Sequence, residues 1–419
     1  MERVGVRNME NQNTDNKFEL LKGDKVLWSV IILISLLSVF PVYSASSNLE
    51  YIVNNGTTTG HVLKHIIFVF IGLGIMRFVG TVKYEYIGKL SSILLLITIG
   101  LLLITMFTGQ KIEGASASRW LKIPGTPISF QPSSFAYLML IIYLCRYLTK
   151  KIKRERLPIE NILYIFGPIL IVFGLVAKDN GSTALMILMV SIAILIVGQL
   201  AWQYVAGFIS LSVVFVVLFL VVALNTNMLG GNRVHTWMSR IETFSNSKKT
   251  TDVEDESIKA KNYQVMQAKA AIVHGGFNGI GPGKSALKQT LPQSVSDFIF
   301  AIIVEEYGWI GAFVLVSLYM IMIIRIVMIA SKMPAFFGSL LVLAIGLMIF
   351  IQLTVNIAVA VNLIPVTGQP LPLISYGGTS MLVTYIQLGI ILNVSSRIQV
   401  YDEEGLGKSQ SLEEINDIA

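Results

Sequence analysis

The chain has 419 residues, of which 54% are hydrophobic and 14% are charged, with a net charge of +7 and a mean hydropathy of +0.69. A soluble domain of this length needs far more charged surface, so the composition excludes an ordinary soluble enzyme and indicates a protein solvated largely by lipid. The single cysteine, Cys145, excludes an internal disulfide and a cysteine-based zinc site.

Apolar runs long enough to cross a hydrocarbon core recur along nearly the whole chain. Because backbone polar groups must be satisfied within lipid, we expect these runs to form helices. The run at 134–148 is the weakest of them, since it is short and ends in Cys145 and Arg146. We therefore predict an all-α membrane protein with about ten transmembrane helices. The predicted spans are 26–43, 62–80, 87–107, 134–148, 161–177, 183–200, 204–225, 298–330, 335–360 and 378–395.

Basic residues concentrate in the tails and short loops that are cytoplasmic if the N-terminus lies inside, with a cluster at 150–156. The positive charge therefore reports orientation, and no nucleic-acid partner is expected. Both termini are predicted to be cytoplasmic, with a tail at 1–25, a membrane domain at 26–397 and a second tail at 398–419. One large external loop, at 227–297, separates spans seven and eight. The N-terminal tail lacks the features of a signal peptide, so the first span is expected to act as an uncleaved insertion signal.

Three predicted external segments, at 108–134, 227–297 and 361–378, are polar yet rich in glycine, proline and aromatic residues. The last contains three prolines and no charge. Such a segment is expected to re-enter the membrane or pack on the bundle and not to remain freely solvated. All three lie on the same side of the membrane, so a site built from them would face outward.

A helix is predicted within the long loop, where Tyr263, Met266, Ala270 and Val273 recur at helical spacing. This apolar face could lie along the membrane interface. A helix packed on the bundle is the alternative.

The glycine-rich sequence GIGPGKS, at 279–285, departs from the phosphate-loop pattern because Asn278 stands where that pattern needs glycine. It is also predicted to be external, with no strand before it, so a nucleotide site is not expected. Glycine exposes backbone amides and Lys284 adds positive charge, which would suit an anionic lipid headgroup.

Asp297 is the most informative acid in the chain, because it immediately precedes the apolar run that begins at Phe298. One interpretation is that Asp297 or Ser296 caps the helix. The other is a carboxylate at the outer membrane surface, where the helix N-terminus favours its ionised form and nearby lipid and protein disfavour it. A general base needs that balance.

Other ionisable residues leave similar alternatives open. Glu305 and Glu306 lie about two turns into the same span, where such residues face a wet cavity or form internal ion pairs. Arg119 suits bidentate binding of phosphate or pyrophosphate, although interfacial anchoring by its neighbour Trp120 also explains the pair. The four histidines lack ligand spacing, so a dedicated transition-metal site is not expected.

Three external motifs, in order, resemble those of the SEDS family (shape, elongation, division and sporulation). The first is GASASRWLKIPG with the later FQPS, the second runs from Tyr263 to Gly311, and the third, GQPLPLISYGGTS, runs from Gly368 to Ser380. The resemblance extends from the first span to the last. Members of this family are ten-span membrane glycosyltransferases that polymerise peptidoglycan from lipid II. The wording of the second motif is closer to the division members of the family than to its elongation members.

The resemblance implies that Asp297 is the catalytic base, because the family's catalytic aspartate precedes a Phe-Ile-Phe-Ala run. It would deprotonate the acceptor sugar hydroxyl, which then attacks the anomeric carbon of the donor and displaces polyprenyl pyrophosphate. No organic cofactor is evident; a divalent cation, magnesium or manganese, would help to balance the pyrophosphate, and its protein ligands are unknown. Substrate-binding roles are implied for Arg119, Lys284, Ser296, Glu306, Ser375, Tyr376 and Gly377.

The resemblance also implies partners and a location. These are lipid II, a polyprenyl-linked glycan strand, a single-span class B transpeptidase and other division proteins, in the bacterial cytoplasmic membrane at the septum. The rival hypotheses are an elongation polymerase of the same family, a flippase for lipid-linked precursors and a non-catalytic division scaffold. The concentration of polar motifs on one face favours surface chemistry over transport.

The sequence departs from the family pattern at two places. Ser134 and Tyr137 stand where Glu and Lys usually follow the QPS segment, and Asn180, beside Asp179, stands where an Asp is usual. A charge pair thought to line the family's cavity is therefore missing or rebuilt in this chain.

Overall fold

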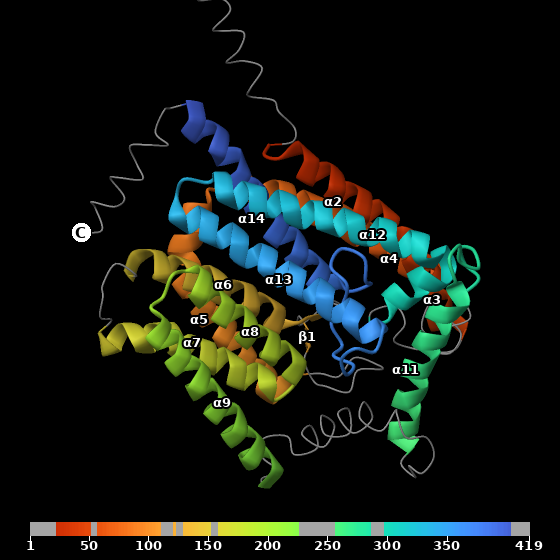
Figure 1. The fold of residues 1–419 in the computed structure, drawn as a ribbon, viewed down its shortest axis with the longest axis horizontal. Coiled ribbons are helices and arrows are strands. Elements are labelled where there is room, and N and C mark those ends of the chain that lie inside the picture. The colour runs from red at the N-terminus through yellow and green to blue at the C-terminus, as the bar shows by residue number, and fades with distance from the viewer. Residues whose placement is uncertain are drawn as a thin grey trace, which may run out of the picture.

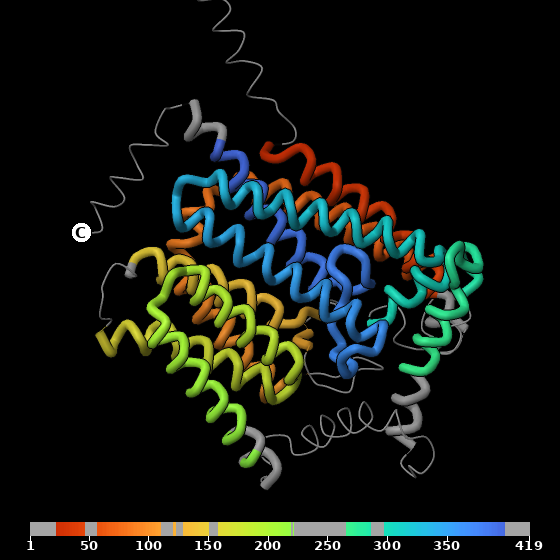
Figure 2. Tube along the Cα trace, viewed as in Figure 1, coloured from red at the N-terminus to blue at the C-terminus, as the bar shows by residue number. Residues whose placement is uncertain are grey.

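The computed structural model describes residues 22–51, 57–109, 120–122, 129–151, 158–225, 256–285 and 297–403. Within these ranges the chain is helical, apart from turns, one ordered loop and one short pair of strands. Most helices run alongside one another as a bundle, and one helix of the long loop stands at the end of that bundle in a different direction (Figure 1). The Cα trace in Figure 2 shows the same arrangement, with residues of uncertain placement in grey.

Helices occupy all ten predicted spans. Seven helical segments of the described part, counting α2 and α3 as one, are long and apolar enough to cross a membrane, and α8 and α9 contain shorter apolar stretches. The helices are Lys25–Leu37 (α2), Val39–Tyr51 (α3), Thr58–Val79 (α4), Tyr84–Thr108 (α5), Pro132–Lys151 (α6), Ile159–Ala177 (α7), Gly181–Val197 (α8), Trp202–Asn225 (α9), Ile299–Lys332 (α12), Phe336–Ala360 (α13) and Gly378–Glu403 (α14).

Helix α6 is central to the bundle although it is not among those seven segments. It packs against α5, α7, α8, α13 and α14. Side chains on several of its faces are buried, among them Leu138, Leu140 and Cys145. The weak hydropathy signal of this segment comes from its polar residues, among them Ser133, Ser134 and Arg146, which a membrane helix tolerates where it faces other helices. The interpretation of Cys145 as a packing residue is confirmed.

The helix predicted in the long loop is present as Glu256–Gly275 (α11) and packs on α12. Its bundle-facing residues are Val265, Ala268 and Ala271, which are buried. Of the predicted apolar face, Met266 and Val273 are 65% and 80% exposed and point away from the bundle. The helix therefore packs on the bundle. The packed face is not the one predicted from the apolar spacing, and its small residues allow close approach to α12.

Helix α12 is broken near its beginning at Gly308, whose φ of 66° and ψ of −169° are not helical. The break frees backbone groups, and the turn at 276–281, directly after α11, pairs with them on both sides. A Cβ at position 308 would lie 2.2 Å from the carbonyl oxygen of Phe277, so only glycine allows this approach. The four bonds are Ile280 N to Glu305 O, Gly281 N to Glu306 O, Trp309 N to Gly276 O and Ile310 N to Phe277 O.

The opposite end of the bundle holds the first and last described residues of the chain (Figure 1). There Asp24 accepts a hydrogen bond from Leu27 N at 2.7 Å, which caps α2, and forms an ion pair with Arg325 of α12. Asn393 of α14 donates to Gly80 O at 2.7 Å, which fixes the turn between α4 and α5. The described ends of the chain thus lie together, opposite α11, as the predicted topology requires.

This topology predicts the accessibility of two exposed positions, Asn278 beside α11 and Ser331 near the end of α12. In a Cys145→Ala background, Asn278→Cys should react with a membrane-impermeant thiol reagent in intact cells, and Ser331→Cys should react only after permeabilisation. Equal labelling of both positions in intact cells would contradict the arrangement.

The break in α12 predicts that Gly308→Ala destabilises the protein. Alanine at this φ/ψ costs about 1–3 kcal/mol, and its Cβ would also displace the 276–281 turn. Unfolding in detergent should detect the loss. Gly74→Ala is the matched control, because Gly74 lies in α4 with open space around it. A Gly308→Ala protein as stable as the Gly74→Ala protein would show that the paired turn contributes little.

Candidate functional site

Asp297 lies two residues before the first residue of α12, with only 9% of its surface exposed. The N-cap residue of α12 is Phe298, whose side chain forms no capping hydrogen bond. Asp297 therefore lies one residue before the N-cap position. The buried side chains of Phe298, Ile299 and Phe300 anchor the start of the helix, so the position of Asp297 is fixed by apolar packing directly after it.

The proline-rich loop at 361–377 brings the third motif to Asp297. Gly368 has a φ of +71°, and a Cβ built there would lie 3.6 Å from Asp297 Oδ2, so the aspartate carboxylate lies over this glycine. Asn356 of α13 donates from Nδ2 to Asp297 O at 3.3 Å and to Gln369 O at 2.8 Å. The buried Asn356 amide thus joins Asp297 to Gln369, the residue after Gly368.

Other side chains hold the rest of this loop. Gln352 donates to Pro370 O at 3.0 Å, and the Tyr319 hydroxyl donates to Pro372 O. Ser375 is buried and accepts a hydrogen bond from Leu371 N at 2.7 Å. The predicted packed loop is confirmed. Ser375 was predicted to bind substrate; in the structure its hydroxyl takes part in a hydrogen bond within the loop.

Tyr376 and Gly377, also predicted to bind substrate, lie at the junction of this loop with α14. The Tyr376 ring lies 5.9 Å from the His61 ring and 6.2 Å from the His65 ring, both on α4. Burial raises the pKa of the Tyr376 phenol, so it stays a neutral hydrogen-bond donor at neutral pH. A Cβ on Gly377 would lie 2.7 Å from Ser380 Oγ, so this position has no room for a side chain unless Ser380 moves.

Helix α8 contacts the same loop through Thr183. Gln369 Nε2 donates to Thr183 Oγ1 at 2.7 Å, and Asn180 Oδ1 accepts from Thr183 N at 3.3 Å, which caps α8. Asn180 stands where the family pattern has Asp. Because an asparagine side chain accepts a capping hydrogen bond as an aspartate does, the departure preserves this local structure.

The FQPS part of the first motif contacts the third motif through a hydrogen bond of Gln131. Leu121–Lys122 (β1) pairs antiparallel with Ser129–Phe130 (β2), and Gln131 N donates to Thr379 Oγ1 at 3.3 Å. Tyr137, one of the departures from the family pattern, is the sixth residue of α6; it is buried, and its hydroxyl donates to Met186 O of α8 at 3.4 Å. A neutral hydrogen-bonded side chain therefore occupies the position of the family's lysine.

Glu306 lies in a neighbouring cluster and is only 1% exposed. It accepts hydrogen bonds from the Ser44 hydroxyl and from Ser285 N, and the Ser285 hydroxyl donates to Glu305. His274 Nδ1 lies 3.5 Å from Glu305 Oε1. Through these hydrogen bonds the two acids hold the glycine-rich turn against α12.

Lys284 belongs to the same turn but has an exposed side chain. The amides of Ile280 and Gly281 are used by carbonyls of α12, and Lys284 N donates to Gly281 O at 3.3 Å. These three amides of GIGPGKS donate to carbonyls of the protein, whereas the amides of a phosphate-binding loop point toward the phosphate. The side chains of Pro282 and Lys284 are exposed, and Lys284 is the charged one of the two.

Arg119 and Ser296 lie outside the described residues. Among the other predicted site residues, the structure brings Asp297 together with the loop that carries Ser375, Tyr376 and Gly377. Three residues at the centre of this arrangement, Thr183, Asn356 and Gln369, were not predicted. Asn356 had a detectable signal, since it is an amide within an otherwise apolar run, where polar residues usually have a specific partner.

In the described part of the chain, no group of three or more His, Cys, Asp or Glu side chains is arranged to hold a metal ion. Asp297 alone could supply one carboxylate oxygen. Magnesium sites that bind phosphates commonly use one or two carboxylates together with substrate oxygens and water. The donor set therefore fits a cation held mainly by a pyrophosphate and does not form a cage for a resident metal.

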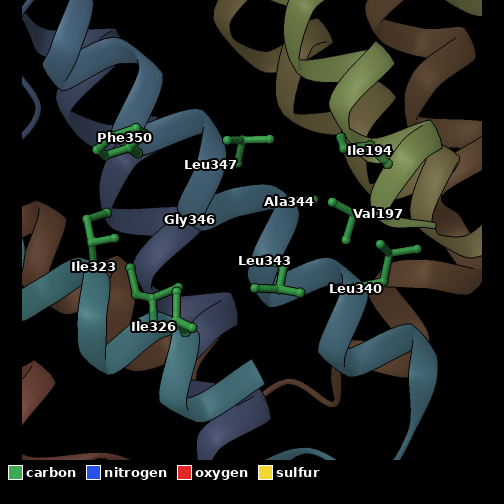
Figure 3. Close-up of a pocket in the computed structure, with 11 residues that line it drawn as sticks. Ile194, Val197, Ile323, Ile326, Leu340, Leu343, Ala344, Gly346, Leu347 and Phe350 are labelled. Carbon is green, nitrogen blue, oxygen red and sulfur yellow. The ribbon is translucent and has the colours of Figure 1, made fainter. Parts of the chain in front are cut away.

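An apolar cavity of about 240 Å³ lies between α8, α12 and α13, lined by residues such as Ile194, Ile326 and Phe350 (Figure 3). Its lining side chains include no acid, base or hydrogen-bond donor. This cavity therefore cannot supply a general acid or base.

Comparisons with known proteins agree with the motifs. The model of the FtsW, RodA and SpoVE family, described as "Cell cycle protein", matches residues 24–399. A protein of Trichlorobacter lovleyi named "Probable peptidoglycan glycosyltransferase FtsW" is 30% identical over 91% of this chain and 96% of its own length. A protein of Enterococcus hirae with the same name is 31% identical over 90% of this chain and 94% of its own length.

Solved structures show the same fold. A chain from a structure titled "Structural coordination of polymerization and crosslinking by a peptidoglycan synthase complex" matches with a TM-score of 0.68 and 22% identity, over 90% of this chain and 98% of that one. A mutant of the rod shape determining protein RodA of Thermus thermophilus matches with a TM-score of 0.62 and 20% identity, over the same shares.

The fold and site define a multi-pass α-helical membrane protein with a buried aspartate and an ordered, proline-rich loop at one end of its bundle. The family model covers nearly the whole chain. The chain belongs to the FtsW/RodA/SpoVE family, the SEDS family that the three motifs indicated.

Proposed function

We propose that the chain is a peptidoglycan glycosyltransferase that polymerises lipid II at the outer face of the cytoplasmic membrane. The observation that carries the proposal is the position of Asp297, a buried acid held over Gly368 without serving as the N-cap of α12. The names of the full-length relatives support the same activity.

In this proposal Asp297 is the general base. Its carboxylate takes the proton of the acceptor hydroxyl, and the hydroxyl oxygen forms a bond to the anomeric carbon of the donor as the bond to the pyrophosphate oxygen breaks. One glycosidic bond forms, polyprenyl pyrophosphate leaves, and configuration at the anomeric carbon is inverted. The base needs a fixed position within hydrogen-bond reach of that hydroxyl. Packing of Phe298 and Phe300 provides such fixation on the side of α12.

The negative charge of the leaving group requires balancing. Lys284, exposed on the turn that docks on α12, and Arg119 in the first motif are the proposed cationic side chains. Ser296, next to Asp297, and Tyr376 would donate hydrogen bonds to the saccharide or pyrophosphate. A magnesium or manganese ion, bound chiefly through the pyrophosphate, would supply further charge neutralisation.

A lipid-linked substrate also needs an apolar surface beside the polar site. A hollow of about 530 Å³ is lined by apolar side chains that include Phe300, Phe313 and Ile357. Phe300 belongs to α12 and Ile357 to α13, so this apolar surface lies on the same two helices that hold Asp297 and Asn356. The combination suits chemistry on a headgroup whose tail remains in the membrane.

The proposal extends to the biological role. The relatives named FtsW favour septal wall synthesis, and the peptidoglycan synthase complex with the same fold favours a single-span transpeptidase as partner. The elongation polymerase, flippase and scaffold hypotheses remain rivals. A scaffold does not require an ionised group at position 297, so this residue separates the polymerase hypotheses from the scaffold hypothesis.

The first functional prediction is that Asp297→Asn abolishes most polymerisation without unfolding the protein. Asparagine is nearly isosteric with aspartate but cannot take a proton at neutral pH, and loss of a general base typically costs about 100-fold to 10,000-fold in rate. Glycan-chain formation from lipid II should be compared at matched folded amounts, with thermal unfolding in detergent as the check. Near-normal polymerisation by the variant would remove Asp297 from the mechanism.

The second functional prediction concerns the departures at Ser134 and Tyr137. We expect the wild-type chain to polymerise lipid II, with a suitable transpeptidase present, although it lacks the usual Glu and Lys. Positions 134 and 137 are three residues apart on α6, so Ser134→Glu and Tyr137→Lys together can form an ion pair. The double variant should remain active with an altered dependence on magnesium.

Tyr137→Lys alone is the matched comparison, because it places an unpaired charge where Tyr137 is buried. Removing one partner of a buried ion pair typically destabilises by about 3–5 kcal/mol, so this single variant should unfold more easily than the double variant. No glycan product from the wild-type chain under any condition would instead favour the scaffold hypothesis.

A further inference from the structure

We propose that Asn356 is a positioning residue, which holds Asp297 at the distance and angle needed to accept the proton from the acceptor hydroxyl. This inference rests on the proposed function and adds a residue to its machinery. Asn356 is buried near the end of α13. It is far from Asp297 in sequence, so no local sequence pattern links the two residues.

The first observation is the state of the Asp297 backbone. In a continuous α-helix, the amide of Ala301 would bond to the carbonyl of Asp297. Here Ala301 N donates to Phe298 O at 3.0 Å, so the Asp297 carbonyl lies outside the hydrogen-bond ladder of α12. A buried carbonyl needs a donor, and Asn356 Nδ2 supplies one at 3.3 Å.

The second observation is that the same Nδ2 group also donates to Gln369 O at 2.8 Å. Gly368, the preceding residue, lies under the Asp297 carboxylate. Asn356 therefore fixes the backbone on both sides of the contact between the carboxylate and Gly368. A side chain with no donor at position 356 would remove one hydrogen bond from each of these carbonyls, and the carboxylate would be held less firmly over Gly368.

The third observation is that this clamp continues to a further helix. Gln369 Nε2 donates to Thr183 Oγ1 at 2.7 Å, so α8 holds the loop from the other side. The Asp297 position is thus tied to α13 and α8 through neutral amide and hydroxyl groups. Neutral clamps hold the backbone without adding a charge next to the base.

The chain offers a matched control one turn earlier on α13. Gln352 donates to Pro370 O at 3.0 Å, a bond of the same kind to the same loop, but the structure gives it no bond to Asp297. Gln352→Leu and Asn356→Leu therefore both loosen the loop, and only the second removes the donor to the aspartate backbone.

The experiment measures polymerisation of lipid II by the wild type and both variants, with the partner transpeptidase present and at matched folded amounts. Asn356→Leu should lower kcat by about 10-fold to 100-fold with KM little changed, because a misplacement of about 1 Å can cost 100-fold in rate. Gln352→Leu should lower kcat less. Thermal unfolding in detergent shows whether the two variants are equally stable.

Two further variants separate the lost hydrogen bonds from lost packing. Asn356→Asp preserves the shape of the side chain but places an oxygen where the two carbonyls need a donor, so its kcat should fall at least as far as that of Asn356→Leu. Asn356→Gln keeps an amide donor and should recover part of the rate lost by Asn356→Leu.

The inference is overturned by a normal kcat in Asn356→Leu, by a loss confined to KM or to the folded fraction, or by an equal loss in Gln352→Leu. The Asp297→Asn measurement separates this result from the proposed function. If Asp297→Asn is inactive while Asn356→Leu is normal, the base assignment stands and the positioning role fails. If Asp297→Asn is fully active, both fail.

Discussion

The structure depends on one constraint: backbone amides and carbonyls that leave a helix inside an apolar bundle must find other partners. Within the described residues, the break at Gly308 and the loop at 361–377 both depart from helical geometry near the end of the bundle where α11 packs. The first is paired by the backbone of the turn after α11, and the second by side chains of α12 and α13. Both solutions bring sequence-distant motifs to the same end of the molecule, so satisfying the backbone also assembles the site.

The two solutions differ in what they leave available for chemistry. The turn at 276–281 uses backbone amides for pairing and so cannot offer those amides to a ligand, whereas the side chain of Lys284 remains exposed. The proline-rich loop lacks an amide at each of its three prolines, and three of its carbonyls accept hydrogen bonds from the side chains of Gln352, Asn356 and Tyr319. Functional side chains can therefore project from rigid segments whose backbones are already satisfied.

The spans could be predicted because each needs a long apolar run, and the glycine- and proline-rich motifs could be placed on one side because basic residues mark the other. The site was predictable only where a residue stands in a local pattern, as Asp297 does before its apolar run. The contacts of Asn356 with Asp297 and of Gln369 with Thr183 join residues far apart in sequence, and no local periodicity records them. The packed face of α11 was missed because alanines approach a neighbouring helix closely but contribute little hydrophobic signal.

The departures from the family pattern also acquire a physical meaning. Asn180 keeps the capping bond that an aspartate would make, and Tyr137 places a neutral hydroxyl between α6 and α8. Both changes retain a hydrogen-bond partner while removing charge. Removing only one member of a buried ion pair would leave the other uncompensated, which is costly, so loss of both Glu and Lys from α6 is the less destabilising route. The contacts that hold the loop beneath Asp297, from Asn356, Gln369 and Thr183, use neither of those charges. The framework of the aspartate can therefore persist in a chain that lacks the charge pair, and the consequences of its absence should fall on substrate or cation binding before they reach the base.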